Sequence, residues 1–275
     1  MTHNITAKDV YTDEVGALYD EGDISCNPIS RDTLLDLAAE HGVGKDSLVL
    51  DIGCANGGVS RKLLERTGCR IEGVELLEFL VSMGQEENKK AGVSVTDRFT
   101  IQQGSILDIP FPDNHFDFVF CSDVIGMVAN VPKALAECRR VLKPGAKMLI
   151  YVVNFPTDRL SEREALELEQ TQGGEAEKTF TEAQVEQYIS DSFTLVKKLV
   201  IGSQFTQYDV EHSKDESEAT KNLLRIARLL TWPDKYIKKY GEQTYRIVLA
   251  GSHWNLYILL GKVRPTVFIA QKDVV

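Results

Sequence analysis

Short, largely apolar runs alternate with amphipathic stretches through the middle of the chain. The runs lie at residues 47–52, 70–74, 98–102, 116–121 and 147–153. Their length and the polar turns around them are typical of buried strands. Stretches with apolar residues at helical spacing separate them, at residues 30–37, 58–67, 78–91 and 132–142. This alternation predicts a parallel sheet covered by helices on both faces.

The second half of the chain has a different pattern. Residues 193–201 and 266–270 are strand-like, whereas 218–230 and 243–260 have helical spacing. The pattern therefore predicts two more strands, with a helical insertion between them. In open α/β sheets the ligand cleft lies outside the carboxyl ends of the strands, so an insertion at this point could act as a cap.

Charge and composition exclude several classes of protein. The chain has 275 residues, and 31 Lys and Arg against 41 Asp and Glu give a net charge of −10. An acidic balance argues against a nucleic-acid partner. No apolar run is long enough for a membrane span, and the polar start Met1–Thr6 does not look like a signal peptide. The five cysteines have no paired spacing, so we expect reduced thiols in a cytoplasmic protein, with no metal site.

The most informative segment is Leu50-Asp51-Ile52-Gly53-Cys54-Ala55-Asn56-Gly57-Gly58. It predicts a strand that ends near an acid, followed by a glycine turn into a helix. Glycines let the backbone turn tightly and approach a ligand closely. The next strand also ends in an acid, Glu75, which could accept hydrogen bonds from both hydroxyls of a ribose.

Two kinds of cofactor could bind at this turn. A dinucleotide site normally has the spacing G-x-G-x-x-G, but the glycines here are Gly53, Gly57 and Gly58. Asp51 would also face a pyrophosphate unfavourably. These residues better suit a cofactor with a ribose, no phosphate and a cationic end, such as S-adenosylmethionine.

The same residues resemble the first two motifs of the class I S-adenosylmethionine-dependent methyltransferases of the small-molecule type. Residues 104–117, which contain Ile109-Pro110-Phe111-Pro112, resemble the third and fourth segments of that family. Glu137-Cys138-Arg139-Arg140-Val141-Leu142-Lys143-Pro144-Gly145 resembles the helix and turn that follow. The resemblance implies a Rossmann-like α/β fold with a seven-stranded, mostly parallel sheet, helices on both faces and a helical cap between the last two strands.

The resemblance also implies a set of cofactor-binding residues. Glu75 would hold the ribose, with Leu76 beside the adenine, while Ser105 and Ile106 would lie at the adenine edge. The complete set is Asp51, Gly53, Cys54, Ala55, Gly57, Glu75, Leu76, Ser105, Ile106, Cys121 and Ser122. Two positions and one stretch of the chain depart from the family pattern. Ala55 replaces a glycine, Ser105 replaces an acid, and residues 123–128 lack the histidine that can serve as a base.

Candidates for chemistry on the acceptor lie elsewhere. Asp123 and His253 are candidate bases, and the alternatives are a polar loop residue and a structural histidine. Trp254 and Tyr257 share a helical face that could line a substrate pocket or could belong to the core.

Tyr11 and Tyr19 lie in an N-terminal segment that often closes the site in similar enzymes. Arg225 and Arg228 could bind an acidic substrate, but a solvated helix face is the favoured interpretation.

We expect a single methyltransferase domain over residues 1–275. Its cofactor-binding core would span residues 43–156, and residues 1–29 and 208–262 would cap the substrate. The expected activity is in-line methyl transfer to a small, moderately apolar molecule. Two alternatives stay open: a cyclase or isomerase that keeps the cofactor without methylating, and a non-catalytic cofactor-binding partner subunit. The acceptor atom and the oligomeric state are not specified by the sequence.

Overall fold

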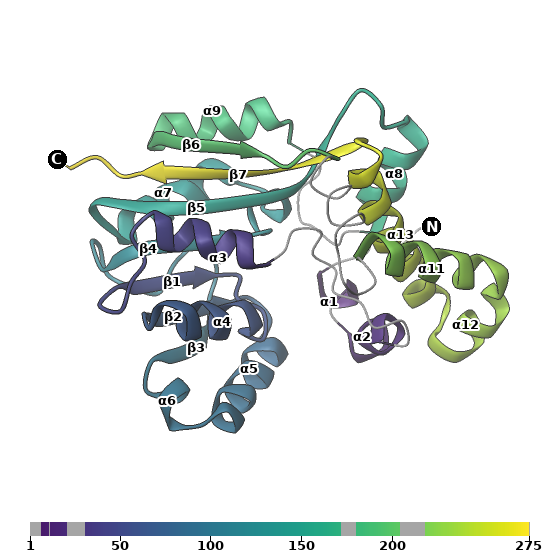
Figure 1. The fold of residues 1–275 in the computed structure, drawn as a ribbon, viewed down its shortest axis with the longest axis horizontal. Helices are drawn as coiled ribbons and strands as arrows, with labels where there is room; N and C mark the ends of the chain where they lie inside the picture. The colour runs from purple at the N-terminus through teal and green to yellow at the C-terminus, as the bar shows by residue number, and fades with distance from the viewer. Residues whose placement is uncertain (1–6, 11, 21–30, 172–179, 204–217, 275) are drawn as a thin grey trace. The chain divides into compact units, whose positions relative to one another are not determined.

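A computed structural model describes residues 7–10, 12–20, 31–171, 180–203 and 218–274. Its central feature is a seven-stranded sheet with the strand order β3-β2-β1-β4-β5-β7-β6 (Figure 1). The strands are β1 Leu48–Ile52, β2 Arg70–Glu75, β3 Phe99–Gln103, β4 Phe116–Ser122, β5 Leu142–Pro156, β6 Thr194–Val200 and β7 Val263–Gln271. This architecture confirms the predicted α/β fold class and the seven strands.

The first five strands pair in parallel. β1 pairs with β2 on one side and with β4 on the other, and β3 and β5 extend the sheet outwards. Figure 1 shows β7 running opposite to its neighbour β6. Because the parallel strands all end at one edge, the chain segments that follow β1, β2 and β4 meet there.

Helices cover the sheet at positions close to those that the sequence predicts. They are α3 Arg31–Glu40, α4 Gly58–Thr67, α5 Glu78–Ala91, α6 Val93–Thr96, α7 Val131–Val141 and α9 Glu182–Ser192. Asn130 caps α7 by accepting a hydrogen bond from the Lys133 N–H at 3.1 Å. Thr181 and Gln184 form a capping box at the start of α9. These caps satisfy backbone donors that have no partner within the helix.

The chain divides into two compact units. One contains residues 30–152, 180–199 and 266–275, and thus most of the sheet. The other contains residues 1–29, 153–179 and 200–265. Its described helices are α1 Ala7–Val10, α2 Asp13–Asp20, α8 Glu162–Thr171, α11 Glu218–Thr231, α12 Pro233–Tyr240 and α13 Glu242–Leu259. Its core includes Leu18, Leu229, Tyr245 and Val248. Because α11, α12 and α13 lie between β6 and β7 in the chain, the predicted helical insertion is confirmed.

Two elements differ from the sequence prediction. Residues 233–240 form the additional helix α12, which begins at Pro233 because a proline fits the first helical turn. Strand β5 begins at Leu142 and runs through the predicted Lys143-Pro144-Gly145 turn. Gly145 adopts a φ of +75° there, and its N–H donates to the carbonyl oxygens of Lys272 and Asp273 at 3.0 and 3.2 Å. Pairing with the chain after β7 therefore makes this turn part of the sheet.

Among the helices that the structure describes, none combines the length and the apolar character that crossing a membrane requires.

Candidate functional site

The glycine turn after β1 leaves no room for side chains at two of its positions. Gly53 has a φ of +72°, and a Cβ there would overlap the Val124 side chain. Gly57 has a φ of +78°, and a Cβ there would lie 2.7 Å from the Phe99 ring. Both glycines are therefore required by conformation and by packing. Val124, which covers Gly53, was not singled out from the sequence because it lies far along the chain in an unremarkable apolar position.

Glu75 holds this turn in place from the end of β2. One of its carboxylate oxygens accepts a hydrogen bond from the Ala55 N–H at 3.0 Å, and the other accepts from the Leu77 N–H at 2.9 Å. The side chain is only 7% exposed. Each carboxylate oxygen can accept a second hydrogen bond, so Glu75 can fix the backbone and still receive hydroxyl donors from a ligand.

Asp51 lies beside Glu75 at the end of β1. It is 4% exposed and accepts a hydrogen bond from the Ser60 hydroxyl of α4. Burial, opposed by the Ser60 bond and reinforced by the charge of Glu75, raises the pKa of Asp51 to about 7. In the part of the chain that the structure describes, neither acid forms an ion pair with Lys, Arg or His. A cationic ligand would therefore be favoured here.

The residues after β2 and β3 form one side of this site. Leu76, which follows the buried Glu75 in the chain, is 52% exposed. Gly104 N–H donates to the Glu75 carbonyl oxygen at 3.0 Å and so brings the loop after β3 next to the end of β2. In that loop Ile106 is buried, and the Ser105 hydroxyl accepts from the Leu107 N–H at 3.1 Å. Ser105 thus stabilises its own turn and keeps its hydroxyl hydrogen available.

The end of β4 contributes a strained acid. Cys121 is fully buried and Ser122 is half-buried. Asp123 has a φ of +60°, and its N–H donates to the Tyr151 carbonyl oxygen at 2.8 Å. Burial of its carboxyl group raises the pKa of Asp123 to about 8. Left-handed backbone is costly for a residue other than glycine and is often found at functional sites.

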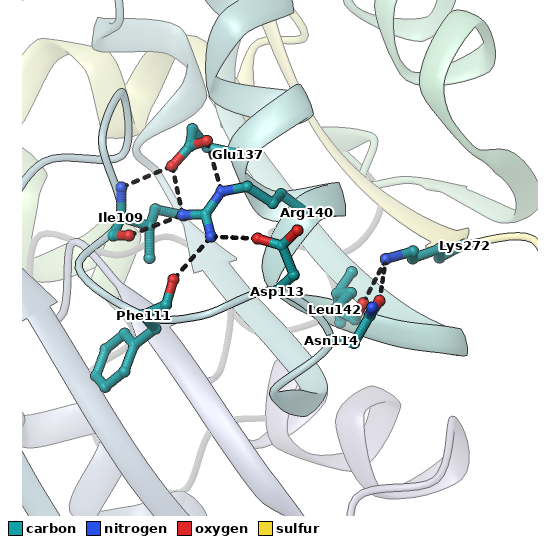
Figure 2. A network of polar contacts seen from close by, with 8 residues as sticks. All are labelled: Ile109, Phe111, Asp113, Asn114, Glu137, Arg140, Leu142 and Lys272. Atoms are coloured by element: carbon teal, nitrogen blue, oxygen red, sulfur yellow. Dashed lines mark hydrogen bonds and ion pairs between the residues drawn. The ribbon is translucent and has the colours of Figure 1, made fainter.

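Arg140 of α7 clamps the loop that follows Ser105 and Ile106 (Figure 2). Its guanidinium donates to the carbonyl oxygens of Ile109 and Phe111 at 2.9 and 2.8 Å. It also donates to Asp113 at 2.9 Å and twice to Glu137 at 2.8 Å. Glu137 in turn accepts from the Ile109 N–H at 2.9 Å. All five guanidinium hydrogens are therefore engaged, a role that sequence reasoning did not assign.

Three of the predicted residues lie in the other unit, on α13. His253 Nδ1 is 3.0 Å from Glu167 Oε1 of α8, and its ring stacks on that of Tyr257 at 6.1 Å between centroids. Tyr257 belongs to an apolar cluster, and Trp254 packs against it. Burial, together with the nearby carboxylates of α8, raises the pKa of Tyr257 to about 12. This packing is what the core interpretation describes, and a role toward a ligand stays a prediction.

The remaining predictions have mixed outcomes. Tyr11 lies outside the described residues, and Tyr19 lies on α2 with a side chain that is likewise outside the description. The solvated-face interpretation is wrong for Arg225, which is 4% exposed and donates to Asn222 and Ser252 at 3.0 and 3.3 Å. Arg228 is exposed, as expected. Arg225 is buried because it faces α13, a contact that no local pattern indicates.

Ala55, the position at which the family resemblance leads one to expect glycine, has a φ of +48°. An alanine pays a steric cost in this left-handed region that glycine avoids. We expect Ala55→Gly to raise the free energy of unfolding by about 1 kcal/mol, as measured by urea denaturation. Ala136, an exposed residue within helix α7, provides a control of opposite sign. There, Ala136→Gly should lower stability by roughly 0.5–1 kcal/mol. A destabilising effect at position 55 would contradict the strain argument.

Comparisons with known proteins give matches over the part of the chain that contains these residues. Residues 50–150 match the methyltransferase domain family. Sterol 24-C-methyltransferase of Gibberella zeae is 34% identical over 115 residues, which cover 42% of this chain and 30% of that protein. Demethylmenaquinone methyltransferase of Symbiobacterium thermophilum is 32% identical over 115 residues, covering 40% of this chain and 44% of that protein. The match therefore spans less than half of either relative.

Solved structures extend the likeness to most of the fold. A putative sarcosine dimethylglycine methyltransferase from Galdieria sulphuraria superposes with a TM-score of 0.69 at 20% identity, covering 89% of this chain and 85% of that one. A phosphoethanolamine N-methyltransferase of Haemonchus contortus gives a TM-score of 0.71 at 21% identity, covering 97% of this chain and 58% of that one. Residues 50–150 are thus similar to a methyltransferase domain, and the solved structures show that the rest of the chain shares the same fold.

Proposed function

We propose that this chain is an S-adenosylmethionine-dependent methyltransferase that acts on a small, moderately apolar molecule. The observation that carries the proposal is the pair of buried acids, Asp51 and Glu75, at the ends of adjacent strands around a glycine turn. The pair provides hydroxyl acceptors and local negative charge. S-adenosylmethionine has a ribose, a sulfonium and an ammonium, and it has no phosphate that these acids would repel.

Each part of the cofactor has matching residues in this proposal. Glu75 accepts the ribose hydroxyls, and the exposed Leu76 packs against the adenine, whose edge meets Ser105 and Ile106. The backbone of the glycine turn (Gly53, Cys54, Ala55 and Gly57) contacts the methionine portion. Asp51, together with the backbone of Cys121 and Ser122, faces its amino end.

The acceptor is expected to be small and moderately apolar. Two curated relatives are named for a sterol and for demethylmenaquinone, both largely apolar molecules. We propose that residues 1–29 and 208–262 contribute to acceptor binding as part of a single domain over residues 1–275. Within them, Tyr11, Tyr19, Trp254 and Tyr257 are the candidate substrate contacts, and His253 is a second candidate base.

Catalysis then requires little covalent chemistry from the protein. The bound cofactor supplies a methyl group that its sulfonium already makes electrophilic. The chain holds the acceptor in line with that group and excludes water, and orientation of this kind can supply roughly 7–11 kcal/mol. Where the acceptor carries a hydroxyl or a protonated amine, a base must also take up the proton.

The proposal is tested by incubating the chain with S-adenosylmethionine and a panel of apolar hydroxyl, amine and alkene compounds. Mass spectrometry should show S-adenosylhomocysteine together with a product heavier than the acceptor by one CH₂ unit. A product of unchanged mass would indicate a cyclase or isomerase. Cofactor binding without turnover until a second protein is added would indicate a non-catalytic subunit.

Asp123 is our candidate for the base. It follows β4 and precedes Val124, which covers Gly53. With a pKa of about 8, its carboxyl group is largely protonated at neutral pH and gains proton-accepting capacity as the pH rises. We expect kcat/KM for a proton-bearing acceptor to rise through about pH 8. Asp123→Asn should lower kcat by roughly 10²- to 10⁴-fold and remove this limb of the pH profile.

Asp97→Asn is the matched control, because Asp97 is exposed on the same compact unit and far from these strand ends. It should leave both kcat and the pH profile unchanged. If Asp123→Asn retains the rise near pH 8, Asp123 is not the base and another group must take the proton.

We also propose a cytoplasmic location. Four cysteines in the described part of the chain, Cys54, Cys69, Cys121 and Cys138, are free and buried. Burial raises the pKa of each of these thiols. Reduced, unreactive thiols fit a reducing compartment.

A further inference from the structure

Helix α11 exposes a stripe of leucines. Leu223 is 55% exposed, Leu230 56% and Leu224 39%, whereas Leu229 on the opposite side is buried in the core. Leu223, Ala227 and Leu230 follow i, i+4, i+7 spacing and share one face. Part of the solvent-exposed face of this helix is therefore apolar, whereas the exposed face of a surface helix is normally polar.

A further exposed apolar side chain, Trp232, lies at the bend between α11 and α12. It is 54% exposed, and its N–H donates to the Arg228 carbonyl oxygen at 3.1 Å. The Lys235 N–H in turn donates to the Trp232 carbonyl oxygen at 3.1 Å. A tryptophan held at such a bend is well suited to the interface between water and lipid.

Basic side chains are also exposed on these two helices. Lys235, Lys238 and Lys239 are exposed on α12, and Arg228 is exposed on α11. Residues 218–246 contain seven Lys or Arg, of which Arg225 is buried, and three Asp or Glu, a net charge of +4 within a chain whose total is −10. The positive charge is thus concentrated where the apolar side chains are exposed.

We propose that α11 and α12 form a peripheral docking surface for an anionic lipid bilayer. The leucines and Trp232 would enter the headgroup region while the basic residues contact lipid phosphates. A second copy of this chain is a poorer occupant, because a two-fold contact would place like positive charges against each other. This inference is independent of the proposed methyl transfer, since it concerns a different surface.

Cosedimentation of the whole chain with vesicles tests the proposal. At low ionic strength the chain should bind vesicles of equal phosphatidylglycerol and phosphatidylcholine, and it should not bind phosphatidylcholine alone. Binding should fall steeply with added salt. Absence of binding to the anionic vesicles would overturn the proposal.

Charge-matched variants test the location of the surface. Replacing Lys235, Lys238 and Lys239 by glutamine should weaken partitioning on the order of 100-fold, at roughly fivefold per charge. The same change at Lys62, Lys89 and Lys90, which are exposed on the other unit, should have little effect. Equal losses from the two triple variants would overturn the proposal, because they would indicate non-specific attraction.

The apolar contribution has its own readout. The chain has two tryptophans, so Trp254→Phe leaves Trp232 as the sole indole fluorophore. Its emission should shift to shorter wavelength on anionic vesicles, and Leu223→Ser with Leu230→Ser should weaken binding. Both leucines are exposed, so these variants should keep the thermal stability and S-adenosylhomocysteine affinity of the wild type. Vesicle binding without a spectral shift, or conversion of a wild-type dimer to a monomer by the serine variant, would overturn the bilayer assignment.

Discussion

Replacement of Glu75 by alanine is expected to weaken S-adenosylhomocysteine binding by about 100-fold or more. Two effects combine, because the variant loses the proposed acceptor for the ribose hydroxyls and also releases the N–H groups of Ala55 and Leu77. Hydrogen bonds to a charged group contribute roughly 1.5–3 kcal/mol each, so the loss of two is enough for this change. Isothermal titration calorimetry measures the affinity directly.

Two further variants separate binding from folding. Glu75→Gln keeps the shape of the side chain and one acceptor oxygen, so it should lie between the wild type and alanine in affinity. Glu78→Ala removes the same charge from an exposed position in the first turn of α5, and it should bind normally. Affinity within twofold of the wild type in a folded Glu75→Ala variant would remove the main support for the proposed function.

Arg140→Ala is expected to lower the free energy of unfolding by about 3 kcal/mol. The variant loses a guanidinium with all five hydrogens engaged, and it frees the loop carbonyls of Ile109 and Phe111. Because the same loop carries Ser105 and Ile106, S-adenosylhomocysteine affinity should fall roughly tenfold, about 1.4 kcal/mol. Urea denaturation and calorimetry give the two values, and faster hydrogen exchange at the Ile109 amide should accompany them.

The neighbouring residue provides a closely matched control. Arg139 lies on the same helix with the same 30% side-chain exposure, and it donates to the Ser192 carbonyl oxygen and to Asp273. Arg139→Ala should cost no more than about 1 kcal/mol and leave ligand affinity unchanged. Arg140→Lys keeps the charge but not the planar fork, so it should resemble alanine more than the wild type. If Arg139→Ala and Arg140→Ala lower stability and ligand affinity equally, the contacts of Arg140 with the loop carbonyls are not the cause of the effect.

Local pattern was sufficient for the parts of the fold that depend on local physics. The range 58–67 predicted for α4 is the range observed, because a left-handed glycine flanks the helix at each end. The order of strands and helices followed from the alternation of apolar runs. The acids and glycines of the site were recognisable because their spacing reflects a turn that few other residues can make.

Features that depend on distant contacts were not predictable in this way. Glu137 and Arg140 look like an ordinary helix-surface pair, yet Arg140 bonds carbonyl groups 29 and 31 residues away. Arg225 contacts Ser252 from 27 residues away, so its burial is visible only once α11 and α13 are packed together. Whether a charged side chain is solvated or buried depends on which element lies opposite, and the local sequence pattern does not show this.

The position of β7 in the sheet has a consequence for the order of folding. β7 lies between β5 and β6, although it is the last strand along the chain. Strands β1 to β4 form one half of the sheet and can pair as soon as these neighbouring segments are synthesised. By contrast, β6 pairs only with β7, so it cannot join the sheet until β7 has been synthesised. The Lys272 N–H then pairs with the Ala146 carbonyl oxygen at 2.9 Å, across more than 120 residues of sequence. Closure of such a distant contact is slow, so the emerging chain should expose the unpaired edge of β5 on the ribosome and depend most on chaperones at that stage.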